Sequence, residues 1–133
     1  MSSDYTYKKG LVYKNQCHVI WCPKYRRPIL VGEIETRLKE ILTEVANEME
    51  VTIKAMEIMP DHIHLFLDFD PRLSLHAVVK SMKGRSARVL RSEFPSLKTR
   101  LPNLWTRSYF MCTVGHVNED TIKQYVEAQE RHQ

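Results

Sequence analysis

The segment at residues 59–69, MPDHIHLFLDF, constrains the fold of this chain most strongly. Large apolar residues alternate with other side chains, which is typical of a β-strand that has one face against a core. A strand is therefore expected at residues 62–69, after a tight turn at Pro60 and Asp61. Its core face holds Ile63, Leu65, Leu67 and Phe69. The even-numbered side chains, including His62 and His64, project from the opposite face.

The two histidines need an explanation, because burying an imidazole costs free energy unless it finds a partner. Side chains two residues apart on a strand point the same way, and their Cα atoms lie about 7 Å apart. Two imidazole nitrogens can converge on one cation across that separation. Two ordinary histidines on a solvated sheet face remain the alternative, and a metal site would need at least a third ligand.

The rest of the chain predicts an α+β fold. The expected strands lie at 16–21, 51–58, 62–69 and 105–114, and the expected helices lie at 34–49, after the cap Ser74, and after the cap Asn118. A phase shift near Ala55 suggests a β-bulge, and the two prolines within 94–103 predict a loop there. The order βαββαβ is the split βαβ plan, ferredoxin-like and RRM-like, with an antiparallel sheet and an added C-terminal helix. The first and third strands are central in that plan, and residues 1–133 are expected to form one domain.

Composition adds limits on partner and compartment. The formal charge of +4 and the pI near 9.0 fit a polyanionic partner without demanding one. Three cysteines, two of them in a C-x4-C spacing, suit neither a disulfide framework nor a zinc knuckle, so free thiols in a reducing cytoplasm are expected. No apolar run approaches the roughly 18 residues of a membrane span, and the N-terminus lacks the apolar region of a signal peptide.

The last helix carries polar chemistry on its apolar stripe. Ile122, Tyr125, Val126 and Gln129 share one face at helical spacing. Tyr125 and Gln129 are one turn apart, so phenol and carboxamide point together. Tyr125 could be an ordinary core aromatic, but a buried amide at Gln129 needs partners.

Two basic segments are candidates for DNA contact. The middle helix carries five cations before its first acidic residue, Glu93, and the loop KYRRP carries three around Tyr25. A solvated helix face is the alternative reading, whereas unpaired bases could stack on Tyr25. The predicted DNA-binding residues are Lys24, Arg26, Arg27, Lys80, Lys83, Arg85, Arg88 and Arg91.

Four motifs together resemble the insertion-sequence 200/605 transposases, which are single-tyrosine HUH transposases. The motifs are HVIWCPKYRRPIL, MPDHIHLFL, LWTRSYFMCTVG and IKQYVEAQ. They cover nearly the whole chain in the family's order and spacing. The resemblance implies that His62 and His64 are the metal-binding HUH pair, that Tyr125 is the catalytic nucleophile, and that Gln129 is the third protein ligand.

The resemblance also implies an activity. Such an enzyme cleaves and rejoins single-stranded DNA at transposon ends through a 5′-phosphotyrosine and recognises imperfect hairpins there. Imidazole and oxygen ligands suit Mg²⁺ or Mn²⁺ better than a structural zinc. The family works as a homodimer whose active sites are completed in trans. The protein is expected to be cytoplasmic, and nucleoid-associated when it acts on DNA.

Two other functions stay open. A metal-dependent phosphodiester hydrolase could also use H-x-H, with Asp61 or Glu57 as a third ligand, but it would leave Tyr125 and Gln129 unexplained. A single-stranded nucleic-acid-binding module could share the fold plan, although the sheet lacks the aromatic pattern of RNA-recognition domains. Covalent capture of DNA would separate the transposase from both alternatives.

Overall fold

The structure is a computed structural model that describes residues 5–113 and 119–129. A four-stranded antiparallel sheet has the order β4-β5-β3-β6. Its strands are β3 (Gln16–Trp21), β4 (Thr52–Met59), β5 (His62–Asp68) and β6 (Phe110–Cys112). Strands β3 and β5 are central, as the split βαβ plan predicts, so the histidine-bearing strand is hydrogen-bonded on both sides.

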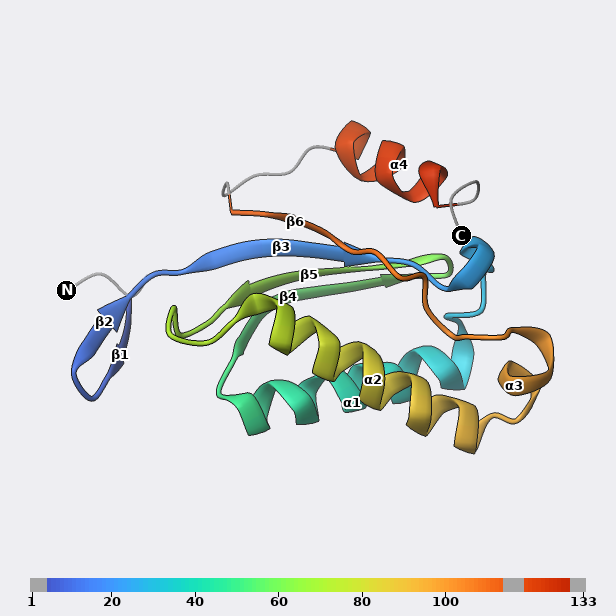
Figure 1. Cartoon of the computed structure of the whole chain (residues 1–133), viewed down its shortest axis with the longest axis horizontal. Coiled ribbons are helices and arrows are strands. Elements are labelled where there is room, and N and C mark those ends of the chain that lie inside the picture. The colour runs from blue at the N-terminus through green and yellow to red at the C-terminus, as the bar shows by residue number, and fades with distance from the viewer. Residues whose placement is uncertain (1–4, 114–118, 130–133) are drawn as a thin grey trace.

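Two long helices cover one face of this sheet (Figure 1). They are α1 (Gly32–Met49) and α2 (Leu75–Glu93). Ser74 caps α2 as predicted, because its hydroxyl accepts a hydrogen bond from the backbone N–H of Ala77 at 3.3 Å. Ile63, Leu65 and Leu67 are fully buried between the sheet and these helices, together with Trp21. The predicted core face of β5 is therefore confirmed.

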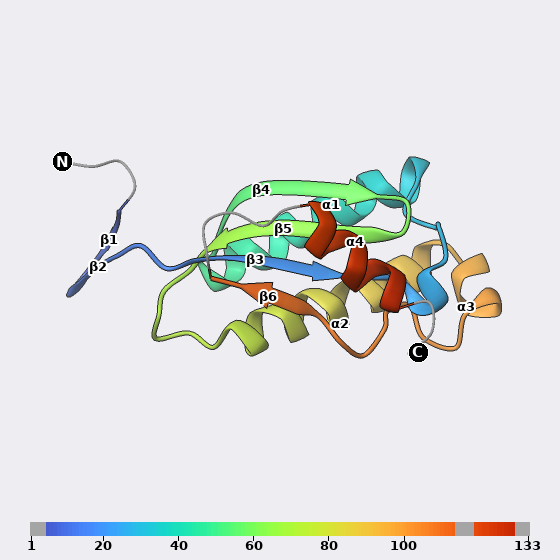
Figure 2. The ribbon, with the colours of Figure 1, turned by 90° about the horizontal axis from the view of Figure 1, so that it is seen from above.

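The last helix, α4 (Glu119–Ala128), lies across the opposite face of the sheet (Figures 1 and 2). A smaller apolar cluster holds it there, in which Val126 packs with Ile20 and Cys22. Ile122 and Tyr125 pack against the same cluster. Alternate residues of β3 thus serve two cores, because Val19 and Trp21 face α1 and α2 whereas Ile20 faces α4.

An N-terminal hairpin was not anticipated from the sequence. Strands β1 (Thr6–Lys8) and β2 (Leu11–Tyr13) pair with each other and project from one end of the molecule (Figure 1). Asp68 joins the hairpin to the sheet by accepting hydrogen bonds from Thr6 Oγ1 at 3.1 Å and from the Asn15 N–H at 3.2 Å. Asp68 is consequently buried, although it lies on the outer face of β5.

Two predicted segments near residue 100 need correction. The expected loop at 94–103 contains the short helix α3 (Ser96–Arg100), and the expected strand at 105–114 is reduced to β6 at its far end. Trp105 forms only an isolated bridge to Pro23. Its indole N–H donates instead to Ser86 Oγ at 3.0 Å and to the Lys83 carbonyl at 3.2 Å, and such acceptors offset the cost of burying an indole N–H.

The register of β4 against β5 shifts between Ile53 and Ala55, which confirms the bulge. The cysteines are free thiols, and burial raises the pKa of Cys17 to about 11 and of Cys22 to about 12. The predicted cap Asn118 lies outside the described residues. Within the described ranges, no helix combines the length and hydrophobicity needed to cross a membrane.

The buried face of the central strand β5 should contribute strongly to the free energy of unfolding. Replacing Leu65 with alanine leaves a cavity at a fully buried position, so the free energy of unfolding should fall by about 2–5 kcal/mol. Urea unfolding measures this change. Val12→Ala is the matched control, because that side chain is 54% exposed and its loss should change stability by less than about 0.5 kcal/mol. Equal effects of the two changes would contradict the assignment of the core face.

Candidate active site

His62 and His64 project from the outer face of β5, as the alternation predicts. Their side chains are 18% and 15% exposed, so both are largely shielded yet open on one side. Each ring has a hydrogen-bond partner at 2.9 Å on one nitrogen, and these two partners come from different parts of the chain. The other nitrogen of His64, Nδ1, lies 3.8 Å from Glu57 Oε2. The environment of each histidine therefore differs, although both stand on one strand.

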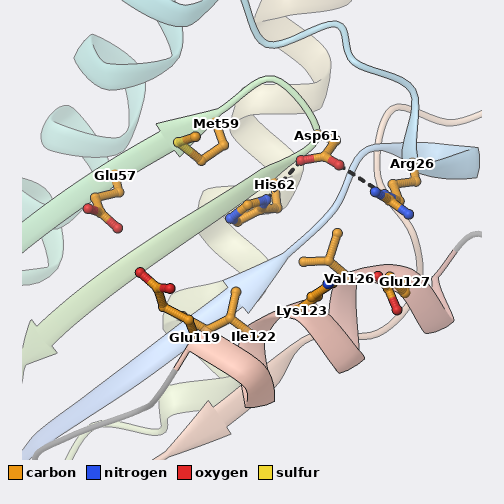
Figure 3. Close-up of a pocket in the computed structure, with 10 residues that line it drawn as sticks. All are labelled: Arg26, Glu57, Met59, Asp61, His62, Glu119, Ile122, Lys123, Val126 and Glu127. Carbon is orange, nitrogen blue, oxygen red and sulfur yellow. Dashed lines mark hydrogen bonds and ion pairs between the residues drawn. The ribbon is translucent and has the colours of Figure 1, made fainter.

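His62 is held by a carboxylate next to it in the sequence. The Nδ1 atom of His62 lies 2.9 Å from Asp61 Oδ1, and the other carboxylate oxygen of Asp61 accepts from Arg26 Nε at 2.9 Å (Figure 3). Burial pushes the pKa of Asp61 upward, but the hydrogen bonds from Arg26 and His62 outweigh it and hold that pKa below its ordinary value. Asp61 is therefore an ionised acceptor, which leaves Nε2 of His62 for another ligand.

His64 is held by a histidine from the neighbouring strand. Its Nε2 atom lies 2.9 Å from His18 Nδ1, so one of the two nitrogens carries a proton that the other accepts. The His18 ring also stacks on Phe66, with centroids 4.5 Å apart. Burial, and then the His18 ring, lower the pKa of His64 below its ordinary value. The neutral imidazole that results is the form that binds metals.

Tyr125 and Gln129 meet at a third residue, Ser108. The Ser108 hydroxyl donates to Gln129 Oε1 at 2.9 Å and lies 2.8 Å from Tyr125 Oη. Serine has one hydroxyl hydrogen, so with that hydrogen on Gln129 the tyrosine hydroxyl must donate to Ser108. Burial raises the pKa of Tyr125 to about 12, against the opposing effect of the Ser108 hydrogen bond. The predicted pairing of Tyr125 with Gln129 one turn later is thus present.

Lys83 secures the segment that carries Ser108. Its ammonium donates to the Thr106 carbonyl at 2.7 Å and to the Ser108 carbonyl at 3.2 Å. Burial lowers the pKa of Lys83 to about 8. The pattern of cations along the helix predicted that this lysine binds DNA. In the structure, its ammonium group instead donates to backbone carbonyls of the protein itself.

Some of the other predicted DNA-binding residues also contact the protein itself, whereas others are exposed. Arg85 forms an ion pair with Glu48 on α1, and Arg91 donates to the Leu101 carbonyl at 3.4 Å. Lys24 lies over the Tyr25 ring, 5.5 Å from its centroid. Three predicted contacts are exposed side chains: Arg27, Lys80 and Arg88.

A groove of about 630 Å³ runs between α2 and the chain before β6. Its lining includes Lys80 and Arg91 from the predicted set, and also Arg107, which the sequence reading did not select. Arg107 lies within the motif LWTRSYF, beside Ser108, and its position in that motif was the available signal. The groove gathers cations from two segments of the chain.

The histidines and the tyrosine have separate surroundings in this structure. A pocket of about 410 Å³ lies between His62 and α4, and α4 lines it with Glu119, Ile122 and Val126 (Figure 3). Tyr125 and Gln129 bind Ser108 instead. Among residues 5–113 and 119–129, no three His, Cys, Asp or Glu side chains are close enough to hold a metal ion.

The sheet order and the paired histidines on a central strand are those expected of single-tyrosine transposases. Residues 11–129 match the family model described as "Transposase IS200 like". The chain belongs to this family of transposases, and it is an enzyme that acts on DNA.

Individual relatives agree with the family assignment. The ISDra2 transposase TnpA of Deinococcus radiodurans is 42% identical over 123 residues, covering 91% of this chain and 88% of the relative. A crystal structure described as a transposase from Deinococcus radiodurans has a TM-score of 0.85 and 41% identity, covering 93% of this chain and 97% of that one. A REP-associated tyrosine transposase bound to a REP hairpin shares the fold, with a TM-score of 0.58 and 15% identity, over 96% of this chain and 69% of that one.

The raised pKa of Tyr125 predicts a pH dependence of stability. A tyrosine has a pKa of about 10 in an unfolded chain, whereas burial raises it to about 12 in the fold. The neutral hydroxyl therefore supports the fold below pH 10, and this support is lost as the pH rises from 10 to 12. Wild type should lose stability more steeply than Tyr125→Phe in that range, measured by urea unfolding. Parallel curves for the two proteins would contradict the burial of this hydroxyl.

Proposed function

We propose that this transposase cleaves and rejoins single-stranded DNA at transposon ends, with Tyr125 as nucleophile and a divalent metal held by His62, His64 and Gln129. The observation that carries the proposal is the pair of same-facing imidazoles on a central strand, beneath the helix α4, which carries Tyr125 and is followed directly by Gln129. A nucleic-acid-binding module would need neither the paired histidines nor the tyrosine.

The donor set suits Mg²⁺ or Mn²⁺. His62 Nε2 is not used by Asp61, and His64 is kept neutral by its surroundings. Two neutral imidazoles and one amide oxygen add no negative charge beside a phosphate, and they leave coordination positions for phosphate oxygens and water. The bound metal would neutralise phosphate charge and orient the phosphorus for attack.

The reaction exchanges one phosphoester for another. The Tyr125 oxygen forms a bond to phosphorus, the bond from phosphorus to the 3′ oxygen breaks, and that oxygen takes up a proton to become a free 3′-OH. The 5′-phosphotyrosine retains the energy of the broken bond, so a second 3′-OH can reverse the step without ATP. Tyr125 must first leave Ser108 and lose a proton that its burial retains.

DNA recognition is proposed for the groove beside α2. Its cations Lys80 and Arg107 stand on different elements, so they can follow a phosphate backbone across the surface. The more distant relative of the same fold is bound to a hairpin. By that analogy, the imperfect hairpins at transposon ends are the proposed ligand of this groove.

A homodimer with active sites completed in trans is also proposed. Tyr125 and Gln129 are engaged with Ser108 rather than with the histidines when α4 lies on its own sheet. Among the described residues, a small apolar cluster around Val126 and these hydrogen bonds to Ser108 hold the helix. Exchange of α4 between two subunits would bring Tyr125 and Gln129 to the partner's histidine pair, and two-fold symmetry would create two such sites.

The nucleophile can be tested by one substitution. Tyr125→Phe keeps the ring that packs against Ile20 and Val126 and removes only the hydroxyl, so binding of end-containing single-stranded DNA should stay near wild type. The covalent protein–DNA adduct formed with Mn²⁺ should disappear on a denaturing gel. Tyr7→Phe, at an exposed tyrosine of the hairpin, is the control that should keep the adduct. An adduct with the Tyr125 variant would exclude Tyr125 as nucleophile.

Subunit mixing tests the trans arrangement. Tyr125→Phe and His64→Ala subunits should each be inactive alone. A heterodimer in trans would combine the tyrosine of the second with the intact histidine pair of the first, so one site should recover. The adduct should then appear only on the His64→Ala chain, which a size tag on one subunit reveals. No adduct from a verified heterodimer would mean that α4 acts on its own subunit.

A further inference from the structure

Asp61 connects the basic loop to the first histidine. Its side chain lies between Arg26, at the end of the short helix η1 (Lys24–Arg26), and His62, at the start of β5 (Figure 3). Both contacts are 2.9 Å long, and each uses a different carboxylate oxygen. The Arg26, Asp61 and His62 side chains are 28%, 24% and 18% exposed, so solvent competes only weakly for these bonds.

The contact with Asp61 determines which nitrogen of His62 can bind another group. An ionised carboxylate only accepts hydrogen bonds, so Nδ1 of His62 must carry the proton that it donates to Asp61 Oδ1. In the neutral ring Nε2 then holds a lone pair. The same hydrogen bond fixes the rotation of the ring. Metal-binding histidines characteristically have such an acceptor on their second nitrogen, and it also strengthens the ligand.

The loop that carries Arg26 is itself held in an unusual conformation. Tyr25 and Arg26 have φ values of 58° and 54°, a left-handed region that residues other than glycine rarely adopt. The Arg26 N–H donates to the Pro23 carbonyl at 2.8 Å, and the Leu30 N–H donates to the Pro60 carbonyl at 3.0 Å. The second bond ties the loop to the turn that contains Asp61. Strain of this kind persists where surrounding contacts impose it, and it is common near functional sites.

We infer that Asp61 is a positioning residue for the metal ligand His62, and that Arg26 holds Asp61 in place. The inference rests on the proposed function, in which His62 binds a divalent cation. It assigns Arg26 a task inside the protein, although its charge alone made it a candidate for phosphate contact. The KYRRP loop would then support metal affinity before any DNA is present.

Calorimetric titration of the DNA-free protein with MnCl₂ tests the inference without relying on activity. Asp61→Ala removes the acceptor and should weaken Mn²⁺ binding by about 10–100-fold. Asp61→Asn keeps an amide oxygen for His62 but loses the charge, so a smaller loss is expected. Arg26→Ala should also weaken binding, because Asp61 loses its anchor, and Arg26→Lys should restore part of the affinity.

The chain offers a matched control pair. Asp70 accepts a hydrogen bond from Arg72 Nη2 at 2.7 Å, and it lies beyond the other end of β5. Asp70→Asn and Arg72→Ala therefore break an equivalent carboxylate–arginine pair away from the histidines, and Mn²⁺ affinity should not change. Circular dichroism shows whether each variant is folded. Asp61→Asn and Arg26→Lys, which preserve shape, answer the question if the alanine variants do not fold.

The outcomes separate this inference from the proposal beneath it. Wild-type affinity in a folded Asp61 variant, together with loss of binding in His62→Ala, would overturn the positioning role and leave the metal site intact. Unchanged binding in His62→Ala would instead overturn the metal assignment. Nitrogen-15 NMR of the metal-free protein gives a second readout: His62 should be the Nδ1–H tautomer, and an Nε2–H tautomer in wild type would also overturn the inference.

Discussion

The two-sided character of β5 is the constraint on which the site depends. Its odd-numbered side chains are buried against α1 and α2, and neighbouring strands bind its backbone on both edges. A slip of one residue would exchange Ile63 and Leu65 for His62 and His64 in the core. The free energy of burying the apolar face therefore also fixes the direction of both imidazoles. Core packing and the geometry of the histidine pair are one feature of the fold.

The periodic spacing of apolar residues was sufficient to predict the strands and helices that bury one regular face. The alternation in β5 and the apolar stripes of α1 and α2 are long patterns, and the structure confirms them. The segment before β6 has the composition of a strand, but the indole of Trp105 donates hydrogen bonds to two acceptors on α2. The hairpin of β1 and β2 is short and leaves Tyr7 and Val12 exposed, so no buried face revealed it.

The same limit applies to the site. Sequence spacing was enough to select two pairs, because it places both side chains of each pair on the same side of their element. The pairs are His62 with His64, and Tyr125 with Gln129. His18 could not, because it lies beside His64 only through the register of β3 on β5, in which His18 is opposite Phe66 and diagonal to His64. The basic helix shows the converse. Its cations appear unopposed in the local sequence, yet Arg85 finds its acid, Glu48, 37 residues earlier on α1.

The segment at 106–108 links the basic helix α2 to α4, which carries Tyr125. Lys83 of α2 binds the carbonyls of Thr106 and Ser108, and the Ser108 hydroxyl joins Tyr125 to Gln129. Because the serine hydroxyl donates one hydrogen, these hydrogen bonds run in one direction: Tyr125 donates to Ser108, and Ser108 donates to Gln129. The proton therefore stays on the tyrosine, and the amide oxygen of Gln129 is occupied. Neither group can act on a phosphate or a metal while both bind Ser108. Undocking of α4 from its own sheet would release both in one step. Under the proposed function, the hydrogen bonds that stabilise this arrangement would therefore also keep the nucleophile inactive within it.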